Sequence, residues 1–231
     1  MNEKVENLNQ QLVALATQFM AKKDDPRWYL KGVYAKPNKT GGVNIIATNG
    51  HRLVVYFDPD GYLDEPVLIC PDSTFIREGK KPDVFNRCLV IREEKDIFLQ
   101  MASGYTSNSD IENEPGHYPD VSNSLLFNGF IDWTDGKGSM APAFAVDGFY
   151  LKDLDAMVPK TVVHGKVSKP GRANFDVIPG GPDKANAFYN RTHEILILIM
   201  PVKSEKRDER PEWLTSFLDL EPEELKEVGT G

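Results

Sequence analysis

An Asn49-Gly50 dipeptide between two apolar runs is the feature that most constrains how this chain folds. The runs extend from Val43 to Thr48 and from Leu53 to Phe57, and both are rich in β-branched and apolar residues. Asn-Gly is favoured in two-residue hairpin turns because both central positions need positive φ angles, which Asn and Gly tolerate. The pattern therefore predicts two antiparallel strands joined by a tight turn.

Further short apolar runs, separated by turn residues, predict a chain made mainly of strands. Helices are expected over 3–21, where Asn2 is a plausible N-cap and apolar side chains recur at helical spacing, over 72–78 with Asp72 as N-cap, and over 147–157. Strands are expected over 28–34, 67–70, 89–91, 97–101, 105–111, 143–146, 161–167, 175–178 and 194–202, and a loop over 179–192. A short helix followed by several strands thus recurs about three times, without a clean sequence repeat.

Composition excludes several classes of protein. The 231 residues are 40% hydrophobic and 27% charged, which suits one large or two modest folded domains. The longest apolar run, Ile195 to Met200, is too short for a transmembrane helix. The polar start indicates no signal peptide, and Cys70 and Cys88 lie in apolar stretches, so buried free thiols and a cytoplasmic location are expected. A net charge of −8 excludes wrapping of nucleic acid over the whole surface but leaves a local basic face open.

The sequence contains no phosphate-binding loop, dinucleotide fingerprint, nucleophile elbow or zinc-ligand spacing. The four histidines are far apart, and no pair of carboxylates stands out for acid/base chemistry. We therefore predict no catalysis, no cofactor and no metal site. An enzyme that uses His51 as acid/base beside a carboxylate remains a weaker alternative.

Five segments carry a resemblance to a known family. Arg27-Trp-Tyr-Leu-Lys-Gly-Val33, followed by Ile46-Ala-Thr-Asn-Gly-His-Arg-Leu53, closely resembles the middle domain of the bacterial sliding clamp, the beta subunit of DNA polymerase III. That family has an Arg-aromatic-aromatic-Leu-x-Gly strand and then an Ala-Thr-Asp-Gly-His-Arg-Leu hairpin; Asn49 here replaces the Asp. In the same order, His-Tyr-Pro-Asp at 117–120 is similar to the family's linker, Phe-Tyr-Leu-Lys-Asp-Leu at 149–154 to a helix of its last domain, and Ile-Met-Pro-Val-Lys at 199–203 to its closing strand.

The resemblance implies an α+β DNA-clamp fold, with antiparallel sheets and helices on one face, of about one and a half to two clamp domains. Residues 1–117 would form a domain like the clamp's middle domain, and 118–203 a truncated form of its last domain. We expect this domain to be truncated because only residues 126–142 are available for its first half. Residues 204–231 would be a charged C-terminal tail. The chain thus resembles a reduced clamp without the family's first domain.

The same resemblance implies a DNA replication processivity factor that forms a homo-oligomer around duplex DNA without reading its sequence. It would tether a DNA polymerase, and bind clamp-loader peptides, through a pocket for a short peptide with a Gln and two or three apolar anchors. The positions that match this pocket are Leu30, Thr48, Gly50, His51, Arg52, Leu53, Pro119, Leu198, Ile199, Met200, Pro201 and Val202. The candidates to face DNA are Lys4, Lys22, Lys23 and Lys152.

Each of these roles has a simpler structural alternative. Leu53, Leu198 and Ile199 could be ordinary core, Gly50 could serve the turn alone, and the charged residues could be solvated surface. The whole chain could instead be a monomeric clamp mimic that captures clamp-binding peptides, or that docks on another clamp to modify it, without encircling DNA. The tail is either an exposed appendage or a linear motif, carrying Trp213, Leu214, Phe217 and Leu218, that inserts in a groove of a partner or of its own chain.

Overall fold

The computed structural model describes residues 5–81, 86–109, 111, 113–121, 151, 154–160, 162–163, 166–167, 175–178 and 185–200. The helices among them are α1 (Gln10–Ala16) and α2 (Ser73–Gly79), with 3-10 turns η1 (Thr17–Phe19), η2 (Trp28–Lys31), η3 (Pro115–His117) and η5 (Leu154–Met157). The strands are β1 (Asn7–Asn9), β2 (Val33–Pro37), β3 (Val43–Thr48), β4 (Arg52–Asp58), β5 (Val67–Ile69), β6 (Arg87–Glu93), β7 (Asp96–Met101), β8 (Thr106–Asn108), β9 (Val162–Val163), β10 (Lys166–Val167), β11 (Asp176–Ile178), β12 (Asn186–Asn190) and β13 (Ile195–Ile199).

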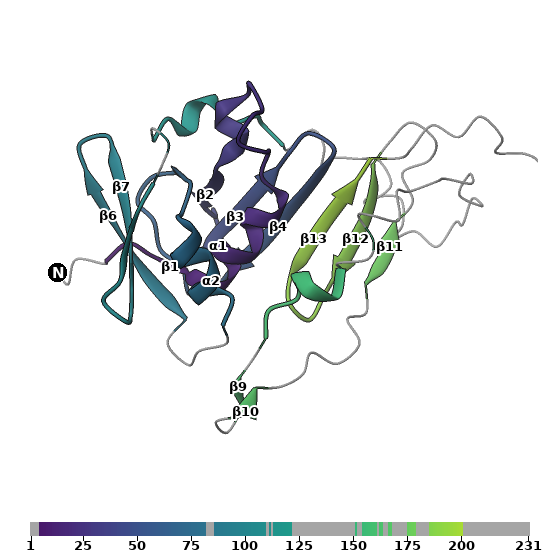
Figure 1. Ribbon diagram of the computed structural model, residues 1–231. Coiled ribbons are helices and arrows are strands. Elements are labelled where there is room, and N and C mark those ends of the chain that lie inside the picture. The colour runs from purple at the N-terminus through teal and green to yellow at the C-terminus, as the bar shows by residue number, and fades with distance from the viewer. Residues whose placement is uncertain are drawn as a thin grey trace, which may run out of the picture.

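A seven-stranded antiparallel sheet, in the order β11-β12-β13-β4-β3-β2-β5, is the framework of the described residues (Figure 1). β2 to β5 come from the first predicted domain and β11 to β13 from the second, and β13 pairs directly with β4. The sheet is therefore continuous across the expected domain boundary at 117/118, which stays a prediction. A second sheet, β1-β6-β7-β8, and the hairpin β9-β10 complete the strand structure.

Apolar side chains cover both faces of the large sheet. On β4, Val54 and Tyr56 belong to the core that includes α1, whereas Leu53 and Val55 belong to a cluster on the opposite face. This follows from the period of two along a strand, which sends successive side chains to opposite faces. We call the side that packs against α1 the helix face and the other side the second face. The large sheet thus has both α-helices on one face, as predicted for the α+β fold, whereas the 3-10 turn η2 packs on the second face through Leu30.

A buried carboxylate joins the two sheets. Asp58, at the end of β4, is 2% exposed and accepts hydrogen bonds from the Asn9 backbone N–H (2.8 Å) and from Arg87 Nη1 (2.6 Å). Arg87 lies on β6, and Asn9 ends β1. A buried carboxylate is tolerated only when it is paired and hydrogen-bonded, so this cluster ties β1 and β6 to the large sheet.

The predicted helix over 3–21 is wrong in its first third. Residues 7–9 instead form β1, where Leu8 lies opposite Cys88 of β6. Asn9, rather than Asn2, caps α1, because its side-chain oxygen accepts hydrogen bonds from the backbone of Gln11 and Leu12. Pairing with β6 satisfies the backbone N–H and C=O groups of residues 7–9, which in a longer helix would have formed hydrogen bonds within the helix.

Other differences also arise where distant pairing decides the structure. Residues 28–31 form the 3-10 turn η2 instead of a strand, and the expected strand over 161–167 is divided between the two-residue strands β9 and β10. β12 occupies part of the expected loop, because β11 and β13 pair with it on both sides. Most other expected strands, and α2 with its Asp72 cap, are confirmed.

Some predicted elements lie beyond what the structure describes. The region 122–150, which includes the strand expected over 143–146, and residues 201–231, which include the predicted tail 204–231, are outside the described residues. The helix expected over 147–157 meets them only at Leu151 and in η5. Both cysteines are free, as predicted, but only Cys88 is buried and Cys70 is half-buried. Among the described residues, no helix has the length and apolar character needed to cross a bilayer.

Candidate functional site

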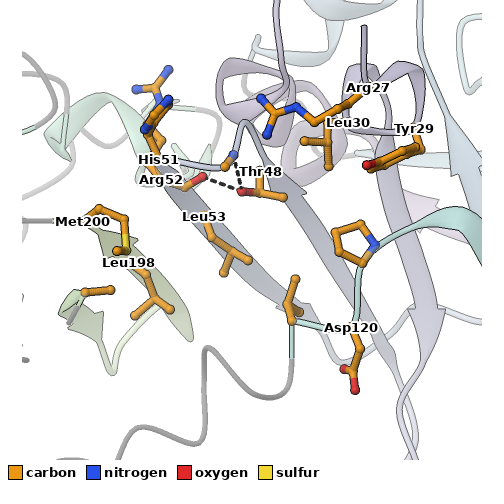
Figure 2. A pocket seen from close by; sticks show the side chains of 14 residues that line it. Arg27, Tyr29, Leu30, Thr48, His51, Arg52, Leu53, Asp120, Leu198 and Met200 are labelled. Atoms are coloured by element: carbon orange, nitrogen blue, oxygen red, sulfur yellow. Dashed lines mark hydrogen bonds between the residues drawn. The ribbon is translucent and has the colours of Figure 1, made fainter. Parts of the chain in front are cut away.

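A pocket of about 400 Å³ opens on the second face, where the ends of β3, β4 and β13 meet (Figure 2). This volume is within the range of small-ligand and peptide-anchor sites. Its lining residues are Arg27, Tyr29, Leu30, Thr48, Gly50, His51, Arg52, Leu53, Pro119, Asp120, Val121, Ala185, Leu198 and Met200.

The floor is a row of side chains across three adjacent strands. Thr48 of β3 lies opposite Leu53 of β4, and Leu53 lies opposite Leu198 of β13. Residues directly opposite one another in antiparallel strands share a face, so the three side chains form one surface. The next residue, Ile199, points to the helix face, where it is 1% exposed in the core. Its predicted place in the pocket is therefore wrong, because the strand period of two sends its side chain the other way.

The hairpin tip is held by a compact hydrogen-bond network. The Asn49 side-chain oxygen accepts from the backbone N–H groups of His51 and Arg52, both at 3.0 Å. Thr48 Oγ1 accepts from the Gly50 N–H at 3.0 Å and donates to the Arg52 carbonyl at 2.8 Å, as Figure 2 shows. Gly50 has a φ of 89°, but Asn49 does not have a positive φ, so the expectation of positive φ at both turn positions holds only for Gly50. The side-chain hydrogen bonds of Thr48 and Asn49 hold the turn without a second residue at positive φ.

Arg27 fixes the tip from outside. Its Nη2 donates to the Asn49 carbonyl at 3.2 Å and forms an ion pair with Asp25 Oδ2 at 2.8 Å. The hydrogen bonds from Arg27 lower the pKa of the Asp25 carboxyl to about 2. The guanidinium lies so close to the turn that a Cβ on Gly50 would be 2.8 Å from Arg27 Nη1. Glycine is therefore favoured at this tip by its φ angle, and a Cβ here would also force the end of the Arg27 side chain to shift.

The closing strand adjoins the hairpin. The Met200 N–H donates to the His51 carbonyl at 3.1 Å, directly beyond the Arg52–Ile199 pair. Met200 is 44% exposed at the rim, and His51 is exposed beside it. The expectation that the Asn-Gly hairpin and the closing segment lie side by side is confirmed.

Stacked aromatic rings fix the segment that forms the third side of the pocket, after the hairpin tip and the closing strand. Tyr118 stacks on Tyr34 of β2, with ring centroids 4.7 Å apart and an angle of 13° between planes. His117 lies against Trp28 of η2 at 5.5 Å between centroids. These contacts bring residues 117–121, which we call the connector, to the second face, so Pro119, Asp120 and Val121 line the pocket. Burial raises the pKa of the Tyr118 hydroxyl, which stays neutral there.

Most of the predicted pocket residues meet in this one place. Leu30, Thr48, Gly50, His51, Arg52, Leu53, Pro119, Leu198 and Met200 all line the pocket. Pro201 and Val202 lie outside the described residues. Arg52 lines the pocket, but its guanidinium donates to the Gln18 carbonyl and lies 4.8 Å from the centre of the Phe19 ring, so its charge is held toward η1.

Sequence reasoning missed five lining residues. Arg27 and Tyr29 belong to the segment that carried the resemblance, and Asp120 and Val121 directly follow Pro119, so neighbouring positions were the available signal. Ala185 precedes β12 in a stretch predicted to be a loop, and no local signal marks it.

The candidate DNA-facing residues are scattered. Lys22 and Lys23 are exposed in the loop between η1 and η2, whereas Lys4 and Lys152 lie outside the described residues. All seven residues of α1 are buried, and none is charged. The nearby helix α2 carries Arg77, which forms an ion pair with Glu78. Within the described ranges, no group of three or more His, Cys, Asp or Glu side chains is placed to hold a metal ion.

Comparison with known proteins gives a clear likeness in fold. No family model matches the chain, and no curated protein sequence matches it significantly. The beta subunit of DNA polymerase from Streptococcus pyogenes superposes with a TM-score of 0.59 at 14% identity, over 88% of this chain and 67% of that one. The sliding clamp from Bacillus subtilis gives 0.58 at 15% identity, over 88% and 65%.

A third clamp, from Bartonella birtlesii and bound to griselimycin, gives a TM-score of 0.59 at 12% identity, over 88% of this chain and 68% of that one. This chain thus spans about two thirds of the length of these clamps. Such low identity establishes the architecture and not the activity. The chain has the fold of the DNA polymerase III beta sliding clamps.

Proposed function

We propose that this protein is a sliding-clamp-like processivity factor of DNA replication, whose pocket binds short peptides of a DNA polymerase and of other partners. The observation that carries the proposal is the convergence of the hairpin tip, the closing strand and the connector on one apolar floor with an open rim. The proposal includes no catalysis and no cofactor.

The pocket suits apolar anchors of a linear peptide. Leu30, Leu53 and Leu198 line the floor but are only 3–6% exposed, because they also belong to the core cluster of the second face. Met200, 44% exposed at the rim, offers the larger apolar surface and can adapt to different shapes because its side chain is unbranched and polarizable. A buried anchor in such an interface contributes about 2 kcal/mol. Two or three anchors of this size, after the cost of ordering the peptide, give binding that is specific and reversible.

A rigid rim would make the binding selective. The hydrogen-bond network of the tip and the Arg27 contact hold the His51 region in one conformation. A preformed site loses less conformational entropy on binding than a mobile one. Once bound, a tethered polymerase acts at high effective concentration near the clamp, which is the physical basis of processivity.

A second candidate is the monomeric clamp mimic, which binds peptides without encircling DNA. It is favoured by α1, whose residues are all buried and uncharged. A helix of this kind presents no cation to phosphates, and sequence-independent DNA contact depends on such cations. The two candidates share the pocket and differ only in DNA binding and assembly.

Binding of a labelled peptide tests the shared claim. We expect a peptide that carries one Gln and two or three apolar anchors to bind the full chain saturably, measured by fluorescence anisotropy. Met200→Ala should weaken it by about 1–2 kcal/mol, or roughly five- to thirty-fold. The matched control is Leu89→Ala on β6, because Leu89 is 39% exposed and does not line the pocket. No binding, or equal loss in both variants, would refute the proposal.

Sedimentation and DNA titration distinguish the candidates. A processivity factor should assemble beyond a monomer and retain circular duplex DNA until the DNA is linearised. The mimic should stay monomeric at high concentration and bind the peptide without DNA.

A further inference from the structure

We propose that the pocket of the free chain is occupied by the chain's own segment 213–220, with the sequence Trp-Leu-Thr-Ser-Phe-Leu-Asp-Leu. The segment would act as a tethered competitor that partner peptides must displace. The inference rests on the proposed function, because it assigns regulation to the same pocket.

The chain leaves the large sheet at the rim of the pocket. β13 ends at Ile199, and Met200 both lines the pocket and donates its N–H to the His51 carbonyl. The following 31 residues, 201–231, therefore start at the rim of the pocket. A segment attached there has little distance to travel before it meets the apolar floor.

The composition of residues 201–231 changes along the sequence. Eight of the ten residues in 203–212 are charged, four of each sign. In 213–220, by contrast, five of eight residues are large and apolar: Trp213, Leu214, Phe217, Leu218 and Leu220. Large apolar side chains in a charged stretch gain most from an apolar surface within reach.

The segment 213–220 is attached closely enough to reach the pocket. Thirteen residue steps separate Met200 from Trp213, which allow up to about 45 Å when fully extended. By the general scaling of chain dimensions with length, thirteen residues of random coil have a root-mean-square span of about 20 Å. Both lengths are greater than the width of the pocket, which has a volume of about 400 Å³ and begins at the attachment point. The effective concentration of the segment at the pocket is then about 1 mM.

The charged residues that follow the apolar anchors are mainly acidic. Residues 219–231 contain five acidic residues and one lysine, a net charge of −4. On the rim, Arg27 is 42% exposed even with its Asp25 partner, and His51 is exposed. Acidic residues that follow the apolar anchors would therefore favour the Arg27 side of the rim over the side formed by Asp120, which also lines the pocket, and this favours one direction of binding.

A tethered competitor changes affinity by a predictable factor. If the segment alone binds with a Kd of about 100 µM, an effective concentration of about 1 mM weakens a partner peptide about tenfold. Weak ligands would be excluded, whereas strong partners or partners with two contacts would still bind.

Two full-length variants test the inference with the labelled Gln-containing peptide as probe. W213A/F217A should bind the probe about tenfold more tightly than the wild-type chain. The matched control, L225A/V228A, removes two apolar side chains of the same tail outside the segment and should leave the affinity unchanged. Circular dichroism spectra and melting temperatures establish that both variants fold.

A labelled synthetic peptide of residues 211–222 provides the second measurement. It should bind the W213A/F217A chain saturably, with competition from the probe, and more weakly when Met200→Ala is added. If the probe binds all chains equally and the 211–222 peptide does not bind, the inference is overturned while the proposed function stands.

If the probe binds no chain but the 211–222 peptide binds as described, self-occupancy stands and partner docking fails. If W213A/F217A abolishes a concentration-dependent self-association of the wild-type chain, the segment belongs to the pocket of a second copy, and the intramolecular inference is overturned.

Discussion

Substitution of Gly50 by alanine tests how the hairpin tip supports the pocket. Gly50 has a φ of 89°, where an L-residue is strained by about 1–2 kcal/mol. Alanine also restricts the unfolded chain, which offsets about 0.4–1 kcal/mol. The backbone effect alone should therefore destabilise the fold by about 1 kcal/mol, which corresponds to roughly 2–4 °C in Tm for a chain of this size.

A contact adds to this backbone effect. The new Cβ would lie 2.8 Å from Arg27 Nη1, whereas ordinary contacts begin at 3.4 Å. The guanidinium must therefore move by about 0.6 Å or more, the difference between these two distances. That displacement disturbs its hydrogen bond to the Asn49 carbonyl. We expect Gly50→Ala to loosen the tip and to weaken binding of the labelled peptide as well as stability.

Gly41 supplies a matched control. Its φ is 98°, and a Cβ there would meet nothing within 4 Å, so Gly41→Ala measures the backbone effect without a contact. Urea unfolding should show a larger loss for Gly50→Ala than for Gly41→Ala. In an Arg27→Ala background the excess should disappear, since the contact is gone. Equal losses at the two glycines, without coupling to Arg27, would refute this account of the tip.

Three further predictions concern the fold around the site. Tyr56→Phe should lower the free energy of unfolding by about 1–3 kcal/mol, because the buried Tyr56 hydroxyl donates to the Met157 carbonyl at 3.0 Å and the variant leaves that carbonyl unpaired. Asp25→Asn should cost stability at neutral pH, and the difference from wild type should shrink as the pH falls from 3.8 to about 2, because the folded-state pKa is lowered across that window. A thiol reagent at pH 8 should label Cys70 in the native chain and Cys88 only after unfolding, because burial raises the pKa of Cys88 to about 12.

Each of these predictions has a contrary result. An unchanged urea midpoint for the Tyr56 variant would mean that its hydroxyl contributes nothing to the packing of η5. A difference for the Asp25 variant that does not change with pH would show that its pKa is not depressed. Labelling of both thiols at equal rates in the native chain would contradict the burial of Cys88.

Local signals in the sequence were sufficient for much of the fold. Alternating apolar residues and the Asn-Gly turn predict β3 and β4, and Asp72 marks the start of α2. These signals work because strand alternation, turn geometry and helix capping depend on a few neighbouring residues. The clamp-like segments also indicated nine of the fourteen residues that line the pocket.

Only the tertiary structure determined which segments pair across long distances. Leu53 and Leu198 are 145 positions apart, and the register of β4 with β13 makes them neighbours on the pocket floor. The same register turns Ile199 into the core, and pairing of residues 7–9 with β6 replaces the start of the expected helix. The free energy of such pairings depends on the partner strand and on the face it buries, so the local pattern of one strand does not contain it.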